Sequence, residues 1–290
     1  MKITNRFDLP APVVRALTKD DYSKGAADLS VTQIIDSPRV RLLRKQHDEK
    51  IEEDVSDMVW SVLGRAAHKV LEDSDDEGYT IEERVFAEVE GWTLSGAIDL
   101  QKHGSKLVLY DYKVTSAWSV IFGKISWEQQ LNCYAYLLWK AKGEKVGAIN
   151  IIAILRDWNR REAGKDNYPS SPILEIPIQL WTIEEQEEYV RSRVRLHQEA
   201  ETALAFGDPL PLCSADERWE KQTTYAVRKK THKRALRVFK SMEEANAFME
   251  EGMVIDERKG ESTRCAQDWC RVAQWCDQYR EACHAGDGTV

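Results

Sequence analysis

The 290-residue chain contains no apolar run close to the roughly 20 residues that a membrane-spanning helix needs. Its first residues, Met-Lys-Ile-Thr-Asn-Arg-Phe-Asp, include no apolar core of a signal peptide. It also has no internal repeat, no low-complexity segment and no P-loop. These absences predict a cytoplasmic protein without a membrane partner, whose six cysteines stay reduced and favour metal binding over disulfides.

Positive charge is in deficit, with a net charge of −8, which argues against adhesion of nucleic acid over the whole surface. The charge is unevenly placed. Residues 72–90 hold nine acidic residues and one basic residue, whereas residues 225–240 hold seven Lys or Arg and no acid. The first kind of segment suits a metal site and the second suits a phosphate backbone. With 42% apolar residues the chain can bury a core.

Hydrophobic periodicity predicts a mixed α/β fold with helices flanking a central sheet. Capping boxes at Ser126 and Thr182 mark two helix starts, and Gly143 and Phe206 lie near the ends of those helices. The first predicted helix carries an apolar stripe through Val59, Leu63, Ala66 or Ala67, and Val70. The predicted elements are, in order, a helix over 56–73, strands over 80–90, 92–101 and 106–114, a helix over 126–142, strands over 148–156 and 173–180, and a helix over 182–206.

Composition divides the chain into three parts. Residues 1–29 are mixed and polar and are expected to form a loosely ordered arm. Residues 30–212 carry the predicted α/β domain. After Pro209-Leu-Pro211 the character changes, and residues 213–290 are expected to form a small cysteine-rich module that contains a basic strand pair at about 223–239 and a short helix.

The central sequence feature runs from Gly96 to Lys113. Asp99 follows an apolar run, and Asp111 and Lys113 lie inside a second one. Because a strand points alternate residues to opposite faces, Asp111 and Lys113 should share a face, with Tyr112 on the other. Buried charges are costly unless they are satisfied, and a hard divalent cation would satisfy the carboxylates. A structural ion pair between Asp111 and Lys113 is the alternative.

Two helices add polar pairs at one-turn spacing. Gly64 and His68 share a face, where the glycine would let another backbone come close, and Gln130 and Tyr134 share a face on a later helix. Each pair alone is compatible with an ordinary amphipathic helix. No motif includes Lys106 or Lys124, and both are expected to be solvated surface residues.

Five features together, in this order, resemble the PD-(D/E)XK nuclease superfamily and specifically its RecB-type exonuclease branch. They are Gly64-xxx-His68, the acidic strand around Glu82-Glu83, Gly96-Ala-Ile-Asp99, Asp111-Tyr-Lys113 and Gln130-xxx-Tyr134. The run Trp127-Glu-Gln-Gln-Leu-Asn-Cys-Tyr134 and the cysteine-rich tail are also similar to phage-encoded exonucleases of this type. The resemblance implies a restriction-endonuclease-like core.

The resemblance also implies roles for individual residues. Asp99, Asp111, the Tyr112 carbonyl and His68 would hold one or two Mg²⁺ or Mn²⁺ ions. Lys113 would orient the attacking water and stabilise negative charge near the phosphate. The additional upstream glutamate could be Glu82 or Glu83, and we prefer Glu83. Gln130 and Tyr134 would line the groove, contacting the phosphate backbone or supporting Lys113.

Some RecB-type nucleases carry a four-cysteine [4Fe–4S] cluster, and Cys213, Cys265, Cys270 and Cys276 resemble that plan. Their spacings are 51, 4 and 5 intervening residues. The four-residue gap and the position of Cys213 after the catalytic core depart from the family pattern. Zn²⁺ held by the same thiolates, or ordinary cysteines, are the alternatives. Cys283 is expected not to bind the metal or cluster, and Cys133 is expected to be a core residue.

Basic and apolar residues alternate in the strand pair around Thr231-His232. Arg228, Lys230, Lys233 and Arg237 could contact phosphates while the other face packs on the following helix. A solvated edge hairpin protected by lysines is the alternative.

These features lead to the hypothesis of a Mg²⁺- or Mn²⁺-dependent DNA exonuclease in the cytoplasm of a bacterial or phage-infected cell, acting in DNA processing or recombination. A DNA endonuclease of the same fold and a non-catalytic DNA-binding scaffold are the alternatives. DNA is the expected partner, and any ATP-driven unwinding would come from a separate helicase or recombination protein.

Overall fold

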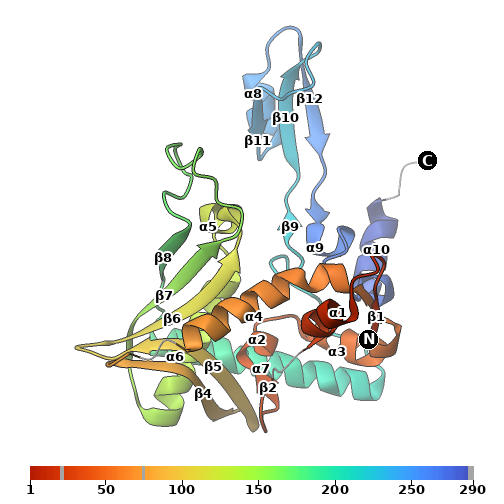
Figure 1. The fold of residues 1–290 in the computed structure, drawn as a ribbon. Helices are drawn as coiled ribbons and strands as arrows, with labels where there is room; N and C mark the ends of the chain where they lie inside the picture. Colours follow the sequence, from red (N-terminus) through yellow and green to blue (C-terminus); the bar gives the residue numbers. More distant parts are fainter. Residues whose placement is uncertain (20–22, 74–75, 287–290) are drawn as a thin grey trace. The chain divides into compact units, whose positions relative to one another are not determined.

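A computed structural model describes residues 1–19, 23–73 and 76–286 (Figure 1). The chain divides into two compact units. The first unit consists of Met1–Pro38 and Asp48–Pro209, and the second consists of Arg39–His47 together with the chain from Leu210 onward. Within the described residues, no helix is both long and apolar enough to cross a membrane.

A mixed β-sheet forms the centre of the first unit, in the order β2-β5-β6-β7-β8, with β4 paired to β5. Pairing is parallel for β2–β5 and β6–β7, and antiparallel for β4–β5, β5–β6 and β7–β8. The predicted mixed α/β class is therefore confirmed. The strands are β2 (Leu29–Ser30), β4 (Tyr79–Val89), β5 (Trp92–Lys102), β6 (Leu107–Thr115), β7 (Val146–Leu155) and β8 (Ile173–Ile178).

Helices flank this sheet. The long α6 packs on β4, β5 and β7 and against α7, and α4 packs on β6 (Figure 1). The buried face of α6, including Leu131, Tyr134 and Leu138, joins the main apolar core as its spacing predicted. The helices of the first unit are α1 (Ala11–Thr18), α2 (Val31–Ile34), α4 (Val59–Glu72), α5 (Ala117–Phe122), α6 (Ile125–Lys142) and α7 (Ile183–Phe206), with 3₁₀ turns at Asp48–Lys50 and Val55–Met58.

Helix ends match the sequence signals in most places. Thr182 forms the predicted capping box of α7, and Gly143 ends α6 in the left-handed conformation, with φ 73°. The capping box predicted at Ser126 is wrong, because α6 already begins at Ile125 and Ser126 lies inside its first turn. The stripe predicted on α4 forms no buried face in the described structure, since Val70 is 70% exposed.

The sheet forks between β5 and β6. These strands pair only over Leu100–Lys102 and Val108–Tyr110, while the other end of β5 pairs with β2 at Leu94 and Ser95. On the edge of β5 that faces β2 and β6, no described strand pairs with residues 96–99, whereas β4 pairs along the opposite edge. The last β5–β6 pair is Leu100 with Tyr110. Asp99 immediately precedes Leu100 and Asp111 immediately follows Tyr110, so both carboxylates lie where the strands separate.

The first residues of the chain pair with the first unit. Strand β1 (Lys2–Thr4) pairs in parallel with β3 (Glu52–Asp54). The buried carboxylate of Asp54 accepts hydrogen bonds from the Thr4 hydroxyl and the Arg6 amide, both at 2.8 Å. These bonds attach residues 2–6 to the first unit. Residues 20–22 of the expected arm lie outside the described residues.

The second unit includes a segment that the sequence prediction had assigned to the α/β domain. Arg39, which is 1% exposed, begins this segment inside α3 (Pro38–His47). Its guanidinium donates to the carbonyls of Leu210 and Pro211 and pairs with Asp277. The predicted domain of 30–212 is therefore corrected: residues 39–47 belong with the C-terminal part of the chain.

The basic strand pair belongs to a three-stranded antiparallel sheet, β11-β10-β12, whose third strand was not predicted. Helix α8 packs on β10 and β11. The remaining elements of the second unit are β9 (Glu220–Lys221), β10 (Thr224–Lys229), β11 (Arg237–Phe239), α8 (Met242–Phe248), β12 (Met253–Arg258), β13 (Glu261–Ser262), α9 (Thr263–Ala266), a 3₁₀ turn at Ala273–Trp275, and α10 (Asp277–Gly286).

Candidate active site

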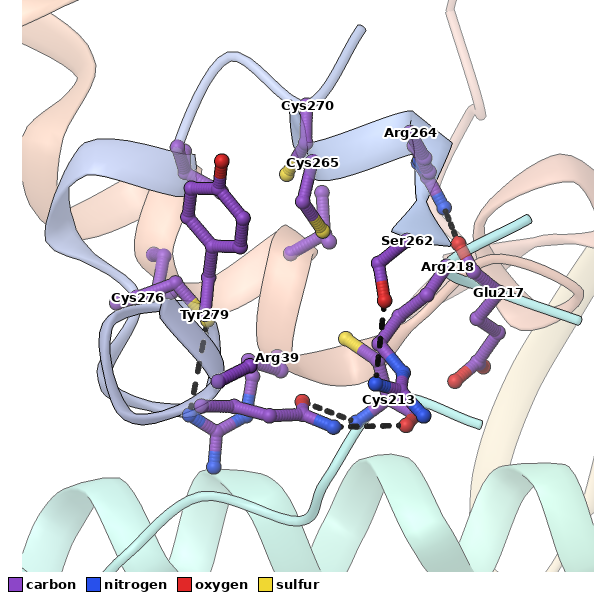
Figure 2. Close-up of a pocket in the computed structure, with 15 residues that line it drawn as sticks. Arg39, Cys213, Glu217, Arg218, Ser262, Arg264, Cys265, Cys270, Cys276 and Tyr279 are labelled. Carbon is purple, nitrogen blue, oxygen red and sulfur yellow. Dashed lines mark hydrogen bonds between the residues drawn. The ribbon is translucent and has the colours of Figure 1, made fainter. Parts of the chain in front are cut away.

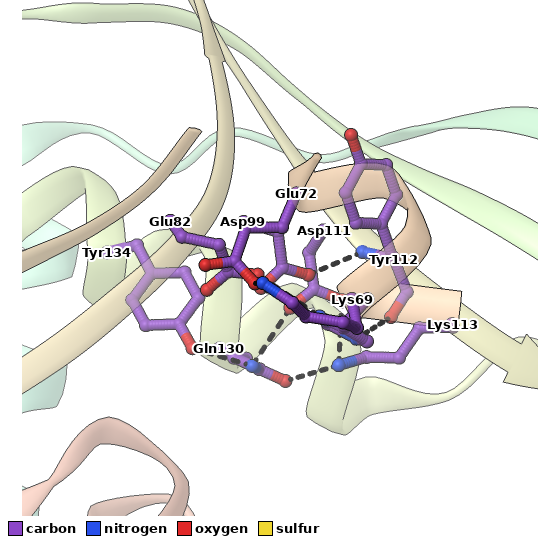
Figure 3. A network of polar contacts seen from close by, with 10 residues as sticks. Lys69, Glu72, Glu82, Asp99, Asp111, Tyr112, Lys113, Gln130 and Tyr134 are labelled. Carbon is purple, nitrogen blue, oxygen red and sulfur yellow. Dashed lines mark hydrogen bonds and ion pairs between the residues drawn. The ribbon is translucent and has the colours of Figure 1, made fainter. Parts of the chain in front are cut away.

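Two buried carboxylates lie at the fork of the sheet (Figure 3). Asp99 is 6% exposed and Asp111 is 1% exposed. The Tyr112 amide donates to Asp99 Oδ2 at 2.7 Å, because separation of the strands leaves this amide available to a side chain. Burial, followed by the nearby charge of Asp111, raises the pKa of Asp99 to about 7. The site thus holds concentrated negative charge at a point where water is largely excluded.

Glu82 and His68 complete a polar group around Asp99. The pairing of β4 with β5 places Glu82 opposite Asp99, and Glu82 adopts φ 52°, a strained value for a residue with a side chain. His68 Nδ1 lies 3.4 Å from Glu82 Oε1 and 3.6 Å from Asp99 Oδ1. His68 Nε2 lies 3.2 Å from the carbonyl oxygen of Tyr112. One imidazole therefore contacts all three strands β4, β5 and β6.

Glu83, the glutamate that we preferred from the sequence, does not join this group. Its carboxylate accepts a hydrogen bond from Gln101 Nε2 at 2.7 Å and pairs with Lys142 Nζ at 2.6 Å. The structure instead places Glu82, the other glutamate that the sequence left open, beside His68 and Asp99. The physical reason is the local backbone: Glu82 leaves the extended conformation, so simple alternation along β4 does not identify the carboxylate that faces Asp99.

Lys113 is held by a second network on the other side of Asp111 (Figure 3). Its ammonium lies 2.7 Å from Asp111 Oδ2 and donates to Gln130 Oε1 at 3.1 Å. Gln130 Nε2 in turn donates to Asp111 Oδ1 at 3.0 Å and to the Tyr134 hydroxyl at 2.8 Å. Asp111 and Lys113 share a face as predicted, and α6 supplies the two residues that fix their positions.

The donor set fits a hard divalent cation. Ligand atoms of His68, Glu82 and Asp99 all lie within 4.8 Å of one another. Two carboxylates with one imidazole suit Mg²⁺ or Mn²⁺. The hydrogen bond with Glu82, more than any other cause, raises the pKa of His68. Asp111 is outside the 4.8 Å group because its oxygens contact Gln130 and Lys113.

The two motif glycines have different surroundings. A Cβ on Gly96 would lie 2.8 Å from two ring carbons of Tyr134 and 3.0 Å from Leu137 Cδ1. Gly96 is therefore what allows α6 to approach β5 and Tyr134 to reach the site. A Cβ on Gly64 would have no described atom within 4 Å, so the close backbone contact expected there is not present.

Sequence reasoning gave no role to Lys124, whose charged neighbours include Arg156 and Lys113. Lys124 was expected to be an ordinary surface lysine, yet burial lowers its pKa, and the charges of Arg156 and Lys113 lower it further. Lys124 is nonetheless exposed to solvent, as expected from the sequence, so solvent screens these effects. No motif marks Lys124 or Arg156.

In the second unit, Cys213, Cys265, Cys270 and Cys276 line one pocket (Figure 2). Burial, then the neighbouring Cys270 and Cys276, raise the pKa of Cys265 to about 11. The structure thus brings together the four cysteines that the sequence singled out. Cys283 is exposed, and Cys133 is buried in the core of the first unit, where burial raises its pKa to about 12.

The basic hairpin differs from expectation at Arg228. Its guanidinium pairs with Asp256 of the unpredicted strand β12, with Nε 2.5 Å from Oδ2 and Nη2 3.1 Å from Oδ1. This bidentate pair occupies guanidinium donors that were expected to meet phosphate, so the structure places Arg228 against Asp256. Lys230, Lys233 and Arg237 are exposed.

Comparison with known proteins identifies the family. A model of the PD-(D/E)XK nuclease superfamily matches residues 39–277, and the chain belongs to this superfamily. Membership implies nuclease activity, a hydrolase reaction. No curated protein matches the chain. A crystal structure of a protein called SSO0001 is similar at 16% identity and a TM-score of 0.41, covering 63% of this chain and 82% of the other.

Proposed function

We propose that this chain is a divalent-metal-dependent deoxyribonuclease that degrades DNA from its ends. The observation that carries the proposal is the arrangement at the fork of the sheet. Three potential ligands, His68, Glu82 and Asp99, cluster beside a lysine that Asp111 and Gln130 hold in place. Phosphodiester hydrolysis requires positioning and charge stabilisation more than covalent chemistry from the protein, and this set provides both.

Hydrolysis replaces one P–O ester bond with a bond to a water oxygen, leaving a phosphomonoester and a sugar hydroxyl. His68, Glu82 and Asp99, with Asp111 adjacent, would hold the divalent cation. When bound, that cation would lower the pKa of water and neutralise charge on the phosphate. Lys113 orients the attacking water and stabilises the negative phosphate oxygens. Gln130 keeps the Lys113 ammonium directed into the site, since it accepts from Lys113 and donates to Asp111.

The test compares linear and covalently closed circular DNA, each with Mg²⁺ or Mn²⁺, using wild type, Asp111→Asn and Lys113→Met. We expect wild type to degrade only the linear DNA. Each substitution should lower the rate by about a hundredfold or more, because it removes a charge that acts in the transition state. Thermal unfolding should show that both variants remain folded.

Each other outcome has a defined meaning. Cleavage of the circle would replace the exonuclease proposal with an endonuclease of the same fold. Wild type that binds DNA but cleaves neither form would favour a non-catalytic scaffold. Activity that survives both substitutions would refute the proposed site.

We further propose that Cys213, Cys265, Cys270 and Cys276 hold a [4Fe–4S] cluster, with Zn²⁺ as the alternative. The four side chains line one pocket, and four thiolates in one place could hold either group. Such a group would replace the thiol protons and join segments that are distant in sequence.

Iron, zinc and visible absorbance per chain, measured on protein purified without oxygen, decide between these assignments. Iron with a coloured protein supports the cluster, and stoichiometric zinc in a colourless protein supports the alternative. Absence of both metals refutes a metal site at the cysteines.

The proposed biological setting is DNA processing or recombination. Within it, DNA is the substrate, and any unwinding is supplied by a separate helicase or recombination protein.

A further inference from the structure

Two large aromatic side chains remain exposed on the short helix α5, which follows β6 directly. Trp118 is 62% exposed and Phe122 is 77% exposed. Their rings stack on each other with centroids 5.6 Å apart and planes 10° from parallel. Ala117 is the buried residue of this helix, so α5 packs through a small side chain and turns its aromatic rings outward. Such a surface gains stability when an apolar or aromatic ligand covers it.

A second exposed aromatic residue in the same unit carries a cation. The Arg156 guanidinium lies 4.3 Å from the ring centroid of Trp60, which is 54% exposed. The Arg156 amide donates to the Thr115 carbonyl at 2.9 Å, so this pair lies where β6 ends and α5 begins. The neighbouring Asp157 accepts a hydrogen bond from the first amide of α5 at 2.8 Å. The backbone thus fixes Arg156 next to the base of α5.

Positive charge extends from this junction to the active site. Lys124 interacts electrostatically with both Arg156 and Lys113, which connects the aromatic region to the catalytic lysine. Lys124 and Phe122 also line an open groove of about 350 Å³, together with Trp127, Ile176 and Ile178. Phe122 therefore lines a groove that is mostly apolar and that also contains the cation of Lys124 and the carboxylate of Glu128.

The active site and the stacked rings are close along the chain. Trp118 lies five positions after Lys113, with four residues between them. Their Cα atoms are therefore at most about 18 Å apart, the length of a fully extended chain of that size. A short single strand could contact both places at once.

We propose that Trp118, Phe122 and Trp60 form a stacking surface for unpaired bases of single-stranded DNA, whose backbone follows Arg156, Lys124 and Lys113 into the active site. This inference rests on the proposed nuclease function and adds the form of the substrate. Aromatic rings interleaved with cations match a polyanion that also presents flat bases. Duplex DNA offers no such match, because its bases are stacked inside the helix.

The test separates base stacking from backbone attraction. Single-stranded DNA and an abasic strand of the same length carry the same phosphates but differ in bases. Binding is measured by fluorescence anisotropy in an Asp111→Asn background, which prevents cleavage. We expect this protein to bind the normal strand at least tenfold more tightly than the abasic strand. Adding Trp118→Ala and Phe122→Ala should weaken binding of the normal strand about tenfold and leave the abasic strand unchanged.

Phe206→Ala is the matched control, since Phe206 is equally exposed, at 79%, on the end of α7. This variant should bind every strand as the background protein does. Trp118→Phe should retain most of the preference, because a second ring can still stack. Lys124→Gln should weaken normal and abasic strands equally and make binding less sensitive to salt.

The outcomes for this inference and for the proposed function are distinct. If wild type cleaves DNA but the two alanine substitutions change neither the affinity for single-stranded DNA nor the KM for its cleavage, the stacking surface is refuted and the proposed nuclease function is retained. If wild type cleaves no DNA while the alanine substitutions abolish the preference for normal strands, the surface stands and the nuclease proposal is refuted. Tenfold tighter binding of single-stranded RNA of the same sequence would overturn the assignment to DNA.

Discussion

The surroundings of Gly96 lead to a quantitative prediction. In Gly96→Ala the new methyl would lie 2.8 Å from the Tyr134 ring, against about 3.5–4.0 Å for a relaxed carbon contact. Tyr134 and Leu137 are buried, so neither can move aside into solvent. Overpacking of this kind costs about 1–3 kcal/mol, of which the lower chain entropy of alanine recovers about 0.5–1. We expect a net loss of roughly 0.5–2 kcal/mol in the free energy of unfolding.

Activity should fall with stability in Gly96→Ala. The Tyr134 hydroxyl accepts a hydrogen bond from Gln130, which also holds Lys113. Displacing the ring by about 1 Å breaks or lengthens that bond, and a misplaced catalytic group can cost about a hundredfold in rate. The melting temperature should drop by about 1–8 °C, measured by differential scanning fluorimetry, and the cleavage rate on linear DNA should drop at least tenfold.

Gly64→Ala is the matched control, because Gly64 lies in the middle of α4 and a methyl there meets no described atom within 4 Å. Alanine in an exposed helix interior stabilises by about 0.5–1 kcal/mol relative to glycine, so this variant should melt higher and cleave normally. In a Tyr134→Ala background, Gly96→Ala should cost less than in wild type, since most of the clash is removed. Equal melting temperatures for Gly96→Ala and wild type, or a destabilised Gly64→Ala, would refute the reasoning.

Three further predictions concern charge. Glu82→Gln should lower the cleavage rate by about ten- to a hundredfold or more, whereas Glu83→Gln, its neighbour, should retain most activity; the reverse order would restore the sequence-based assignment. The pKa of Asp99 is raised to about 7 from an ordinary value of about 4. Its contribution to the stability of the metal-free protein is therefore present at low pH and is lost as the pH rises through about 7. A bound cation displaces the proton on Asp99, so the gain in melting temperature from Mn²⁺ over EDTA should grow between about pH 6 and pH 8. A gain that stays constant over this range would contradict the prediction. Reversing Lys230 and Lys233 to Glu should weaken DNA binding and flatten its salt dependence by roughly one to two units of slope, and unchanged binding would exclude a role for the hairpin.

Local sequence patterns predicted most of the sheet and the central part of the site. Alternation in β6 correctly placed Asp111 and Lys113 on one face, and the one-turn spacing of Gln130 and Tyr134 predicted their shared contact. Each of these inferences needs only the geometry of one element. The clustering of Asp99 with Asp111 was expected only from the resemblance to the PD-(D/E)XK nuclease superfamily.

The errors have long-range or irregular causes. Sequence reasoning kept Glu82 and Glu83 as alternatives and preferred Glu83, because the register of that strand could not be read from the sequence. The positive φ of Glu82 interrupts the alternation of β4, and no pattern of residue types signals it. The apolar stripe of α4 predicted a buried face, but periodicity indicates which side is apolar and not whether another element covers it. The electrostatic proximity of Lys124 and Arg156 depends on segments that are distant in sequence, which no local pattern signals.

The burial of Arg39 could not be predicted from the sequence for a further reason. A basic helix such as α3 suggests a solvated surface, and arginine is rarely fully buried. Its partners lie up to 238 residues away in the chain. Only the folded structure shows that carbonyl oxygens and Asp277 satisfy the guanidinium.

This arrangement has a consequence for biosynthesis. The second unit is assembled from two segments, and the first emerges from the ribosome long before its partners exist. At about 5–20 residues per second, the 238 residues from Arg39 to Asp277 take roughly 12–48 s to synthesise. During that interval the guanidinium of Arg39 and the apolar face of α3 have not yet met the partners that they contact in the second unit, while much of the first unit is already complete. The order of synthesis therefore makes folding of the cysteine-containing unit the last step, so that a chain terminated early would retain the catalytic residues and lose the pocket.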